Sequence, residues 1–342
     1  MLFIDALYIH ESGAKSLLEY FIEKLIEQRK DFFILFDKRL ASSCIHQLSP
    51  DQYQLVTATE ASRKKVYQSI KNRASTFFCF ANVPPPIEIS KIPVFIYFHN
   101  VLLLSNFFDN NYYTARSKLI LQAKWAYIQW KNKPAYQWIV QSERVKQELS
   151  KRLGIKKHQV YVLPFFREEV PIQHNPHQIN KFIYVADGVP QKNHAVLLQA
   201  WEYLQDRYQL TPELHLTIPA RFTELIATIQ QLKHKGIKII NHGVIDKAEL
   251  NLLYRECGYL VFPSLRESFG LPLIEAVQAG CGILASNLSF VSDVISSSAN
   301  FNPYDYQEMA EVVADIVIQE KRVPSYLKVQ NHINELIEKL HF

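Results

Sequence analysis

The residues best suited to chemistry lie close together in the segment PSLRESFGLPLIEAVQAGCG, at 263–282. Its first part follows an apolar run, and the proline and glycines after it predict a loop that leads into a helix. Backbone N–H groups at the start of a helix bind phosphate, and carboxylates accept hydrogen bonds from sugar hydroxyls. The segment therefore predicts a site for phosphate and a sugar, with Glu267 in the loop and Glu275 in the first helical turn. From spacing alone, the alternative is that Glu267 caps the loop and Glu275 only complements the helix dipole.

An alternation of strands and helices along the whole chain must position these residues. Short apolar runs predict strands at 2–8, 32–36, 76–81, 94–99, 136–142, 160–165, 181–186, 214–219, 237–242, 259–264 and 283–286. Helical patterns lie between them, including 14–29, 112–131, 142–153, 195–207 and 247–257. Strands that are apolar on both faces and flanked by helices indicate parallel sheets. Because the strands are too many for one sheet, we expect an α/β fold of two doubly wound, Rossmann-like domains that face a central cleft.

The polar segment REEVPIQHNPHQINK, at 167–181, is the predicted linker. We therefore expect an N-terminal acceptor-binding domain over 1–170 and a C-terminal donor-binding domain over 171–320. Residues 321–342 are expected to form a helix, with a break at Pro324, that packs back toward the first domain. Ligands of doubly wound sheets bind at the carboxyl ends of the strands, so site residues should follow strands in both domains.

Composition and charge exclude several classes of protein. With 48% hydrophobic and 21% charged residues the chain is not disordered, and nine glycines in 342 residues exclude glycine-repeat architectures. No apolar stretch approaches 18 residues, so we expect no membrane-spanning helix. Residues 1–170 carry 24 basic and 15 acidic residues, and the rest carry 14 and 18. The basic half favours an anionic partner, unless its lysines only form an uneven solvated surface.

Cysteine usage and the N-terminus bear on the compartment. Cys44, Cys79, Cys257 and Cys281 show no CxxC spacing and no histidine partner at a zinc-binding distance, which favours free thiols in a reducing compartment. The first residues, MLFIDALYIH, are typical of a first strand rather than of a signal peptide. We therefore expect a cytoplasmic protein.

Glu267 and Glu275, eight residues apart around SFGLPLIE, resemble the E-x7-E motif of family 4 glycosyltransferases, which have the GT-B fold. Segments 184–201, 240–257 and 285–295 are similar to the phosphate, base-binding and post-motif segments of that family, and 94–100, 138–149 and 160–165 are less specific matches. The resemblance implies a retaining transfer of a sugar from a nucleotide-diphosphate sugar to a saccharide or lipid-linked acceptor. It places the reaction in the biosynthesis of a bacterial surface polysaccharide or lipopolysaccharide.

The resemblance also implies roles for single residues. Glu267 and His99 would be catalytic, because Glu267 would hold the donor sugar and His99 would approach the transferred sugar. The implied donor-binding residues are Gly13, Lys192, Val244, Arg266, Ser268, Phe269, Gly270, Leu271 and Glu275. Cations and N–H donors suit this reaction, since negative charge grows on the departing phosphate. A solvated lysine is the alternative for Lys192, and a structural histidine for His99; we interpret His10 and His194 as structural.

One position departs from the family. Asp187 stands five residues before Lys192, where the family usually has an arginine on the diphosphate. Either Asp187 points away, or Arg266 or Lys15 supplies the missing cation. The resemblance implies a metal-independent enzyme without a cofactor, and the sequence has no DxD pair and no His/Cys cluster.

Residues 112–133, YYTARSKLILQAKWAYIQWKNK, form a basic, aromatic-rich helical pattern. This pattern favours an anionic membrane surface as a partner, at the inner face of the membrane, although a helix whose tryptophans face the core would look the same. No nucleic acid is expected, because the basic residues are dispersed. The rival functions are a non-catalytic nucleotide-sugar-binding subunit of the same fold, favoured by Asp187, and a dinucleotide-dependent oxidoreductase. The oxidoreductase lacks support, since no G-x-G-x-x-G occurs.

Overall fold

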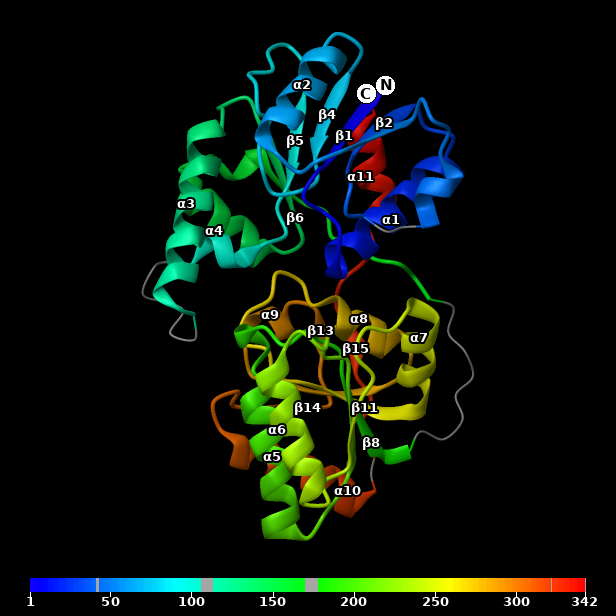
Figure 1. Ribbon diagram of the computed structural model, residues 1–342, viewed down its shortest axis with the longest axis vertical. Helices are drawn as coiled ribbons and strands as arrows, with labels where there is room; N and C mark the ends of the chain where they lie inside the picture. The colour runs from blue at the N-terminus through cyan, green and yellow to red at the C-terminus, as the bar shows by residue number, and fades with distance from the viewer. Residues whose placement is uncertain (41–42, 106–112, 170–177, 321, 342) are drawn as a thin grey trace. The chain divides into compact units, whose positions relative to one another are not determined.

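The computed structural model describes residues 1–40, 43–105, 113–169, 178–320 and 322–341. The chain forms two compact units, Met1–Arg167 with Gln330–Phe342, and Glu168–Val329 (Figure 1). The expected α/β class is confirmed, since each unit contains a parallel sheet flanked by helices. The division falls at Arg167, slightly before the expected position 170; most of the predicted linker, 170–177, lies outside the described residues. The cleft expected between the two domains stays a prediction.

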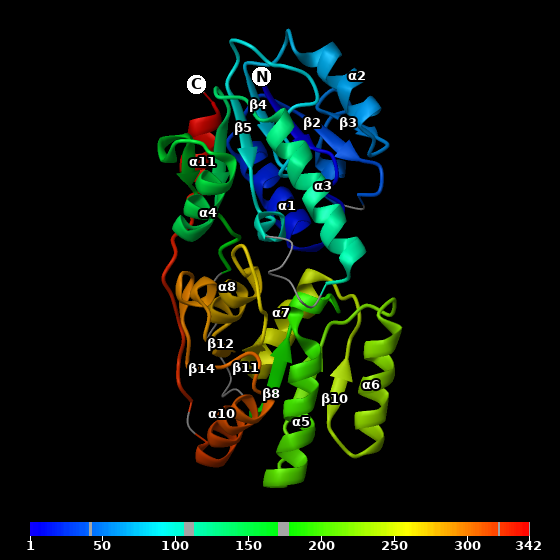
Figure 2. The same cartoon turned by 90° about the vertical axis from the view of Figure 1, so that its left-hand side faces the viewer.

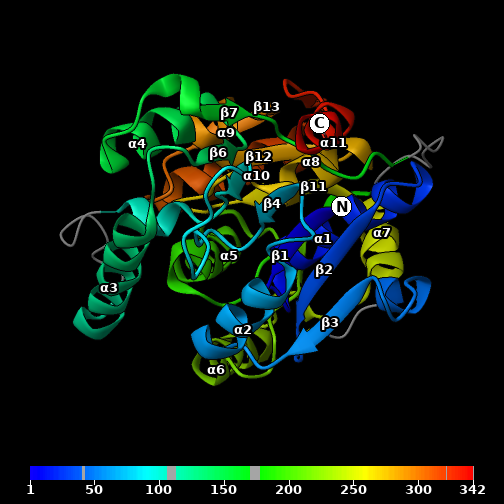
Figure 3. The same cartoon turned by 90° about the horizontal axis from the view of Figure 1, so that it is seen from above.

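The sheet of the first unit has seven parallel strands in the order β3-β2-β1-β4-β5-β6-β7. The strands are β1 (Leu2–Ala6), β2 (Phe32–Asp37), β3 (Tyr53–Val56), β4 (Thr76–Cys79), β5 (Val94–Tyr97), β6 (Gln137–Val140) and β7 (Val160–Val162). Strand β3, which pairs with β2 at the edge of the sheet, was not predicted from the sequence (Figure 3). Its central residues are exposed, so it lacks the apolar run that marks the inner strands.

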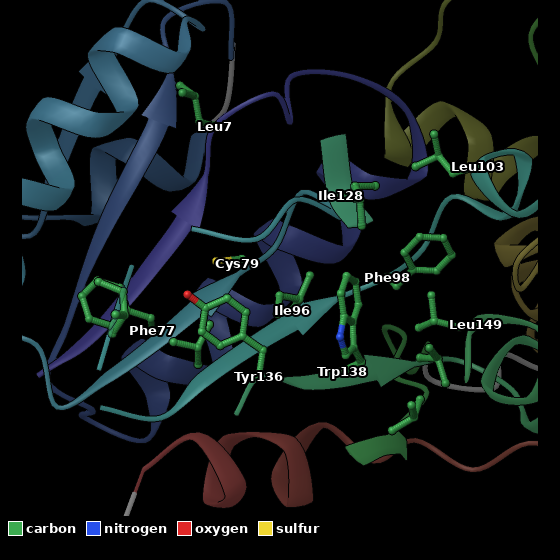
Figure 4. Packing of buried hydrophobic residues seen from close by; sticks show 14 of the residues in the cluster. Leu7, Phe77, Cys79, Ile96, Phe98, Leu103, Ile128, Tyr136, Trp138 and Leu149 are labelled. Atoms are coloured by element: carbon green, nitrogen blue, oxygen red, sulfur yellow. The ribbon is translucent and has the colours of Figure 1, made fainter. Parts of the chain in front are cut away.

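Buried side chains from one face of these strands form a large core cluster of the first unit (Figure 4), and the alternate residues on the other face are buried as well. Phe77, Ile96 and Trp138, from three neighbouring strands, are completely buried. The helices that cover the sheet are α1 (Ser12–Glu27), α2 (Glu60–Ile70), α3 (Ala115–Lys131), α4 (Glu143–Leu153) and α11 (Ile333–Leu340), with short 3-10 helices η1 (Ser43–Gln47), η2 (Val101–Leu104) and η3 (Lys157–Gln159). Parallel sheets need this covering because neither face is polar.

The C-terminal segment is interrupted around Pro324, as expected, but its helical part is shorter than the expected range 321–342. Helix α11 lies beside α1, where Gln28 Nε2 donates to Asn334 Oδ1 at 2.9 Å (Figure 1). Residues 322–329 belong instead to the second unit, where β15 (Tyr326–Leu327) pairs with β13 (Ile295–Ser296). Pro324 explains the difference, because proline lacks the N–H that a helix interior requires.

The sheet of the second unit has six parallel strands in the order β10-β9-β8-β11-β12-β14. The strands are β8 (Gln178–Tyr184), β9 (Glu213–Leu216), β10 (Ile239–Asn241), β11 (Cys257–Phe262), β12 (Gly282–Ser286) and β14 (Ala299–Phe301). The helices are η4 (Pro190–Lys192), α5 (His194–Tyr208), α6 (Thr223–His234), α7 (Lys247–Glu256), α8 (Leu271–Gln278), α9 (Ser289–Ser292) and α10 (Tyr306–Gln319). Figure 2 shows α5 beside α6, and α5 also packs on α10. Strand order reverses beside β1 and β4 in the first sheet and beside β8 and β11 in the second, so each unit has one switch point where ligands of this fold bind.

The described residues bear on two expectations about the chain as a whole. No helix there has both the length and the hydrophobicity needed to cross a bilayer. Cys79, Cys257 and Cys281 are buried free thiols, as predicted, whereas the side chain of Cys44 lies outside the description.

Candidate active site

The loop after β11 leads into α8 through Gly270, which has a left-handed backbone with φ of +82°. A Cβ at this position would come within 3.0 Å of Leu273 Cδ1, so both the backbone conformation and the space favour glycine. Helix α8 begins at Leu271, so the proline that predicted a helix start, Pro272, lies in its first turn. Phe269 is buried, whereas Arg266, Glu267 and Ser268 are partly exposed. The predicted loop and helix N-terminus are therefore present, with Glu267 at their entrance.

Lys192 and Glu267 form an ion pair, with Nζ 2.6 Å from Oε1. Their side chains are 18% and 15% exposed, so the pair is largely shielded from water. Lys192 follows β8 and Glu267 follows β11, the two strands at the switch point of the second sheet. The structure thus brings these two predicted residues into contact, and the solvated alternative for Lys192 is wrong.

Hydrogen bonds between loops hold this pair in place. Leu265 N–H donates to the Gln191 carbonyl at 2.8 Å, and Asn193 Nδ2 donates to the Pro263 and Pro303 carbonyls at 3.2 and 2.6 Å. Tyr184 OH donates to the carbonyl of Lys192 at 2.8 Å and lies 2.9 Å from Ser264 Oγ. Burial and the nearby Glu267 and Asp187 carboxylates raise the pKa of Tyr184 well above its usual value, so this hydroxyl stays a hydrogen-bond donor.

Glu275 contacts α7 rather than the end of its own helix. Its Oε1 lies 2.7 Å from Lys247 Nζ, and its Oε2 accepts a hydrogen bond from Tyr254 OH at 3.2 Å. Lys247 Nζ also lies 3.7 Å from Glu169 Oε1. Since Glu275 is the fifth residue of α8 and is bound by two side chains, complementing the helix dipole does not account for its position. Its carboxylate keeps further lone pairs that could accept hydroxyl donors.

Asp187 is paired with a cation that the sequence analysis did not identify. Its Oδ2 lies 3.8 Å from Arg221 Nη2, on the loop between β9 and α6. The two loops pack closely: Ala186 N–H donates to Thr217 Oγ1 at 3.2 Å, and a Cβ on Gly188 would come within 2.5 Å of the Phe222 ring. Lys15, one of the cations considered for this position, lies on α1 of the first unit, 3.8 Å from Glu19 Oε1.

Sequence reasoning also missed Lys247 and Tyr254. Lys247 follows Asp246, which forms a capping box with Glu249, and the pattern DKAE marks that helix start in the sequence. Tyr254 carries no such signal, because its role depends on the packing of α7 against β11 and β8. Val244, predicted to bind the donor, is 80% exposed on the loop between β10 and α7.

In the first unit, His99 follows β5 and is held by Asn82. The Asn82 Oδ1 accepts from His99 N–H at 2.7 Å, and His99 Nε2 lies 3.2 Å from the Phe80 carbonyl. Burial lowers the pKa of His99 to about 4, so the imidazole is neutral at physiological pH. His194 is buried against Tyr184, with ring centroids 4.9 Å apart, which agrees with its structural interpretation.

The predicted helix 14–29 places Gly13 before its first residue. Gly13 lies in the first turn of α1, not in a loop before it, because the extended N-cap is Glu11.

The two tryptophans of α3 differ in exposure. Trp125 is buried, as the alternative interpretation of residues 112–133 required, but Trp130 is 71% exposed. Lys131 Nζ lies 4.5 Å from the centre of the Trp130 ring. Residue 112, at the start of the predicted helix, lies outside the described residues.

The described residues contain no group of three or more His, Cys, Asp or Glu side chains placed to hold a metal ion. Metal independence itself stays a prediction.

The second unit matches a known family model, and the fold of the chain matches solved structures. Residues 165–332, just under half of the chain, match the family model described as glycosyl transferases group 1. Two solved structures share the fold: Anabaena HepE in complex with UDP and glucose (TM-score 0.69, 15% identity, 94% of this chain and 91% of that one) and a glycosyltransferase from Rickettsia africae (TM-score 0.68, 14% identity, 99% and 97%).

Two curated proteins are similar in sequence. The serotype-specific mannosyltransferase WbdA of Escherichia coli is 31% identical over 135 residues, which cover 38% of this chain and 17% of that protein. The O-antigen chain mannosyltransferase RfbU of Salmonella typhimurium is 23% identical over 176 residues, 51% of this chain and 49% of that protein. The matched region therefore spans less than a fifth of the E. coli relative and about half of the Salmonella one.

Proposed function

We propose that this chain is a glycosyltransferase that transfers a sugar from a nucleoside diphosphate sugar to a saccharide or lipid-linked acceptor. The relatives named as O-antigen mannosyltransferases support a role in polysaccharide or lipopolysaccharide synthesis. The observation that carries the proposal is the Lys192–Glu267 pair beside the N-terminus of α8, at the switch point of the second sheet.

In the proposed reaction, the bond between the anomeric carbon of the sugar and the diphosphate breaks, and the oxygen of an acceptor hydroxyl forms the new bond to that carbon. Negative charge grows on the departing phosphate, which takes up the proton of the acceptor hydroxyl. Lys192 and the backbone N–H groups at the start of α8 stabilise that charge. Glu267 holds Lys192 in place before the donor binds and accepts hydrogen bonds from the sugar. Glu275, fixed by Lys247 and Tyr254, accepts hydrogen bonds from the ribose hydroxyls.

We assign Arg221 as the second cation at the diphosphate, in place of the arginine that Asp187 replaces. Asp187 lies 3.8 Å from its guanidinium and so orients it. A carboxylate directly beside a diphosphate would be repelled by its negative charge. In this assignment Asp187 orients the Arg221 guanidinium, and Arg221 rather than Asp187 contacts the diphosphate.

The finer parts of the proposal rest on the resemblance of the segment around Glu267 and Glu275. They are membership of family 4 through the E-x7-E motif, retention of the anomeric configuration, and catalysis without a metal ion or cofactor. His99 and Gly13 are proposed to approach the donor from the first unit, His99 as a neutral hydrogen-bonding group.

A location in the cytoplasm, at the inner face of an anionic membrane, is part of the proposal. The exposed Trp130 and Leu119 on α3, together with the adjacent Lys131, support it. Flotation with anionic vesicles at low salt tests it: binding that is lost in a Trp130→Ser, Lys131→Ser variant is expected, and a protein that stays at the bottom of the gradient contradicts it.

Titration calorimetry with UDP, GDP, ADP and dTDP tests the proposed function. We expect one of them to bind to the wild type and to Glu267→Gln, and the matching nucleotide-sugar to be turned over by the wild type only. Glu224→Gln, on the exposed start of α6, is the control for loss of a carboxylate. If none of the four nucleotides binds, the proposal is wrong.

The second candidate is a non-catalytic nucleotide-sugar-binding subunit. Asp187 favours it, because this carboxylate replaces a cation that the family uses. A wild type that binds a nucleotide, and complements a deletion strain equally well as Glu267→Gln, would establish this candidate instead.

A further inference from the structure

Three titratable side chains of the second unit lie in a row along β9 and the end of β10. Glu213 and His215 are two residues apart on β9, so their side chains point to the same face of the sheet. Ile240 of β10 pairs with His215, which places His242, two residues further on, at the end of the same face. His215 is 4% exposed. Polar groups buried to this degree need hydrogen-bond partners, and the row supplies them.

Hydrogen bonds join the three side chains. His215 Nε2 lies 2.7 Å from Glu213 Oε1, and His215 Nδ1 lies 2.9 Å from His242 Nε2. The two imidazole rings are nearly coplanar, with 8° between their planes and 5.2 Å between their centres. The distance between the centres exceeds the N···N distance by twice the distance from the centre of an imidazole ring to its nitrogen. Both nitrogens therefore lie on the line between the rings, which is the arrangement of a linear hydrogen bond and not of ring stacking.

The Glu213 carboxylate fixes which ring nitrogens carry the protons. Burial opposes its ionisation, but the hydrogen bond from His215 and the charges of His215 and Lys181 hold the pKa of this carboxyl below its ordinary value. An ionised carboxylate only accepts hydrogen bonds, so His215 Nε2–H donates to Glu213. In the neutral His215 ring, Nδ1 then carries the lone pair. His242 donates to this lone pair through Nε2–H, and its own Nδ1 is left as an acceptor.

His242 begins the loop that joins β10 to α7. Its backbone N–H donates to the Leu216 carbonyl at 2.8 Å, so backbone and side chain both tie the start of the loop to β9. At the other end of the loop, Asp246 caps α7, and Lys247 in the first turn of that helix lies 2.7 Å from Glu275. A shift of His242 would therefore reach the Lys247–Glu275 pair through a loop of a few residues.

The charged and titratable groups around this ring come from three elements. They are Glu213 and His215 on β9, Lys181 on β8, 3.6 Å from Glu213, and Glu249 and Glu256 on α7. Burial and His215 lower the pKa of His242, against the effect of the three carboxylates, so this ring is neutral at physiological pH. Its Nδ1 has no hydrogen-bond partner in the described part of the chain. A proton taken up there leaves both hydrogen bonds of the row in place.

We propose that Glu213, His215 and His242 form a hydrogen-bonded relay that positions the loop between β10 and α7, with His215 as the positioning residue. The relay holds the start of this loop and, through it, Lys247 and Glu275. Its effect on donor affinity rests on the proposed function, in which Glu275 binds the ribose. The tautomers of the relay and the order of the loop do not, since they follow from the second unit alone.

Long-range 1H–15N NMR of the histidine rings, in the full-length protein at neutral pH, tests the tautomers. We expect His242 of the wild type to carry its proton on Nε2, whose 15N signal lies well upfield of that of an unprotonated ring nitrogen. Glu213→Gln should lose this preference, because a glutamine side chain can donate as well as accept. His234→Asn, at an exposed histidine at the end of α6, is the control and should leave the His242 signals unchanged.

Two substitutions of His215 separate positioning from packing. His215→Asn keeps an acceptor oxygen near the place of Nδ1, whereas His215→Phe keeps the ring but has no lone pair. We expect hydrogen–deuterium exchange of residues 241–246 to become about tenfold faster in His215→Phe, the effect of one lost hydrogen bond, and to change much less in His215→Asn. A packing role alone predicts the reverse order, because asparagine leaves a cavity and phenylalanine does not.

Nucleoside diphosphate titration of the same proteins tests the effect on donor binding. We expect affinity to fall about 3- to 30-fold in His215→Phe and to be largely recovered in His215→Asn. Equal affinity of wild type and His215→Phe overturns this effect. If no nucleoside diphosphate binds to the wild type, the proposed function is wrong, while the ring signals and the exchange rates still decide on the relay.

Either of two results overturns the relay itself. One is a wild-type His242 that carries its proton on Nδ1 at neutral pH. The other is exchange of residues 241–246 that is equally fast in His215→Phe and in the wild type. If His215→Phe fails to fold, Glu213→Gln decides, and an unchanged His242 tautomer in that variant contradicts the proposal.

Discussion

Lys192 Nζ lies 2.6 Å from Glu267 Oε1, which joins the end of β8 to the loop after β11 across 75 residues of sequence. Both side chains are largely buried, so neither charge is well solvated by water. Each side chain compensates the charge of the other. The pair also holds the Lys192 ammonium beside the N-terminus of α8, where a diphosphate is proposed to bind.

Removal of one partner of this pair should therefore lower the free energy of unfolding more than removal of both. We expect Lys192→Met to lower the free energy of unfolding of the second unit by about 1–3 kcal/mol, because Glu267 is left as an uncompensated charge. The double variant Lys192→Met, Glu267→Gln should recover most of that stability but not nucleotide binding or sugar transfer. Urea denaturation and calorimetry measure the two effects; recovery of activity together with stability would contradict the proposed role of Lys192.

Replacement of Glu275 by glutamine should act mainly on donor affinity. The variant keeps the size of the side chain but loses its charge and weakens the contacts with Lys247 and Tyr254. We expect KM for the nucleotide-sugar to rise about tenfold, equivalent to about 1.4 kcal/mol, with a smaller change in kcat. Lys247→Met is the control, because it removes a contact that positions Glu275 but keeps the Glu275 carboxylate. A kcat that falls while KM is constant would assign Glu275 to the chemical step instead.

Arg221→Gln tests the replacement cation. The guanidinium lies 3.8 Å from Asp187 and its side chain is 55% exposed, so the substitution should leave stability unchanged within about 0.5 kcal/mol. Affinity for the nucleoside diphosphate should fall about 5- to 30-fold, and the corresponding nucleoside should bind equally well to both proteins. Equal affinity of variant and wild type for the diphosphate would exclude Arg221 from the site.

Two buried histidines make the protein less stable in mild acid. Burial lowers the pKa of His99 to about 4 and of His194 to about 3, from an ordinary value of about 6.5. The unfolded chain therefore binds protons that the folded chain does not, and stability falls as the pH drops from about 6.5 toward these lower values. We expect the urea midpoint to fall between pH 7 and pH 4.5, and to fall less in His194→Phe; identical pH profiles would show that His194 is not a contributor.

The buried pair of Arg63 and Asp5 should be essential for the stability of the first unit. Arg63→Met leaves the Asp5 carboxylate buried with Tyr67 as its remaining side-chain donor among the described residues, and we expect the free energy of unfolding to fall by about 3–5 kcal/mol. Lys235→Met removes the cation of the exposed pair with Glu202 in the second unit and should change stability by less than about 1 kcal/mol. Equal losses in the two variants, measured by chemical denaturation, would contradict the argument from burial.

Much of the fold could be predicted because its signals are local. Apolar runs such as those around β1, β5 and β11 are buried on both faces, and helices separate them, so periodicity alone indicates parallel sheets. Strands β3 and β14 escaped prediction because they are short edge strands whose residues are partly exposed. Their strand state comes from hydrogen bonds to β2 and β12, which no local pattern encodes.

For the candidate site, the sequence by itself determined the residue types and their place after strands: Glu267, Gly270 and Glu275 in one loop and helix, and Lys192 after another strand. The tertiary structure alone decided the partners. Strand order brings β8 beside β11 and β9 beside β8, and so pairs Lys192 with Glu267 and Arg221 with Asp187. The packing of α7 and α8 against the same strand brings Lys247 to Glu275. The physical reason is that ion pairs form between groups that are close in space, and in a doubly wound sheet crossover connections, rather than spacing along the chain, set which loops are neighbours.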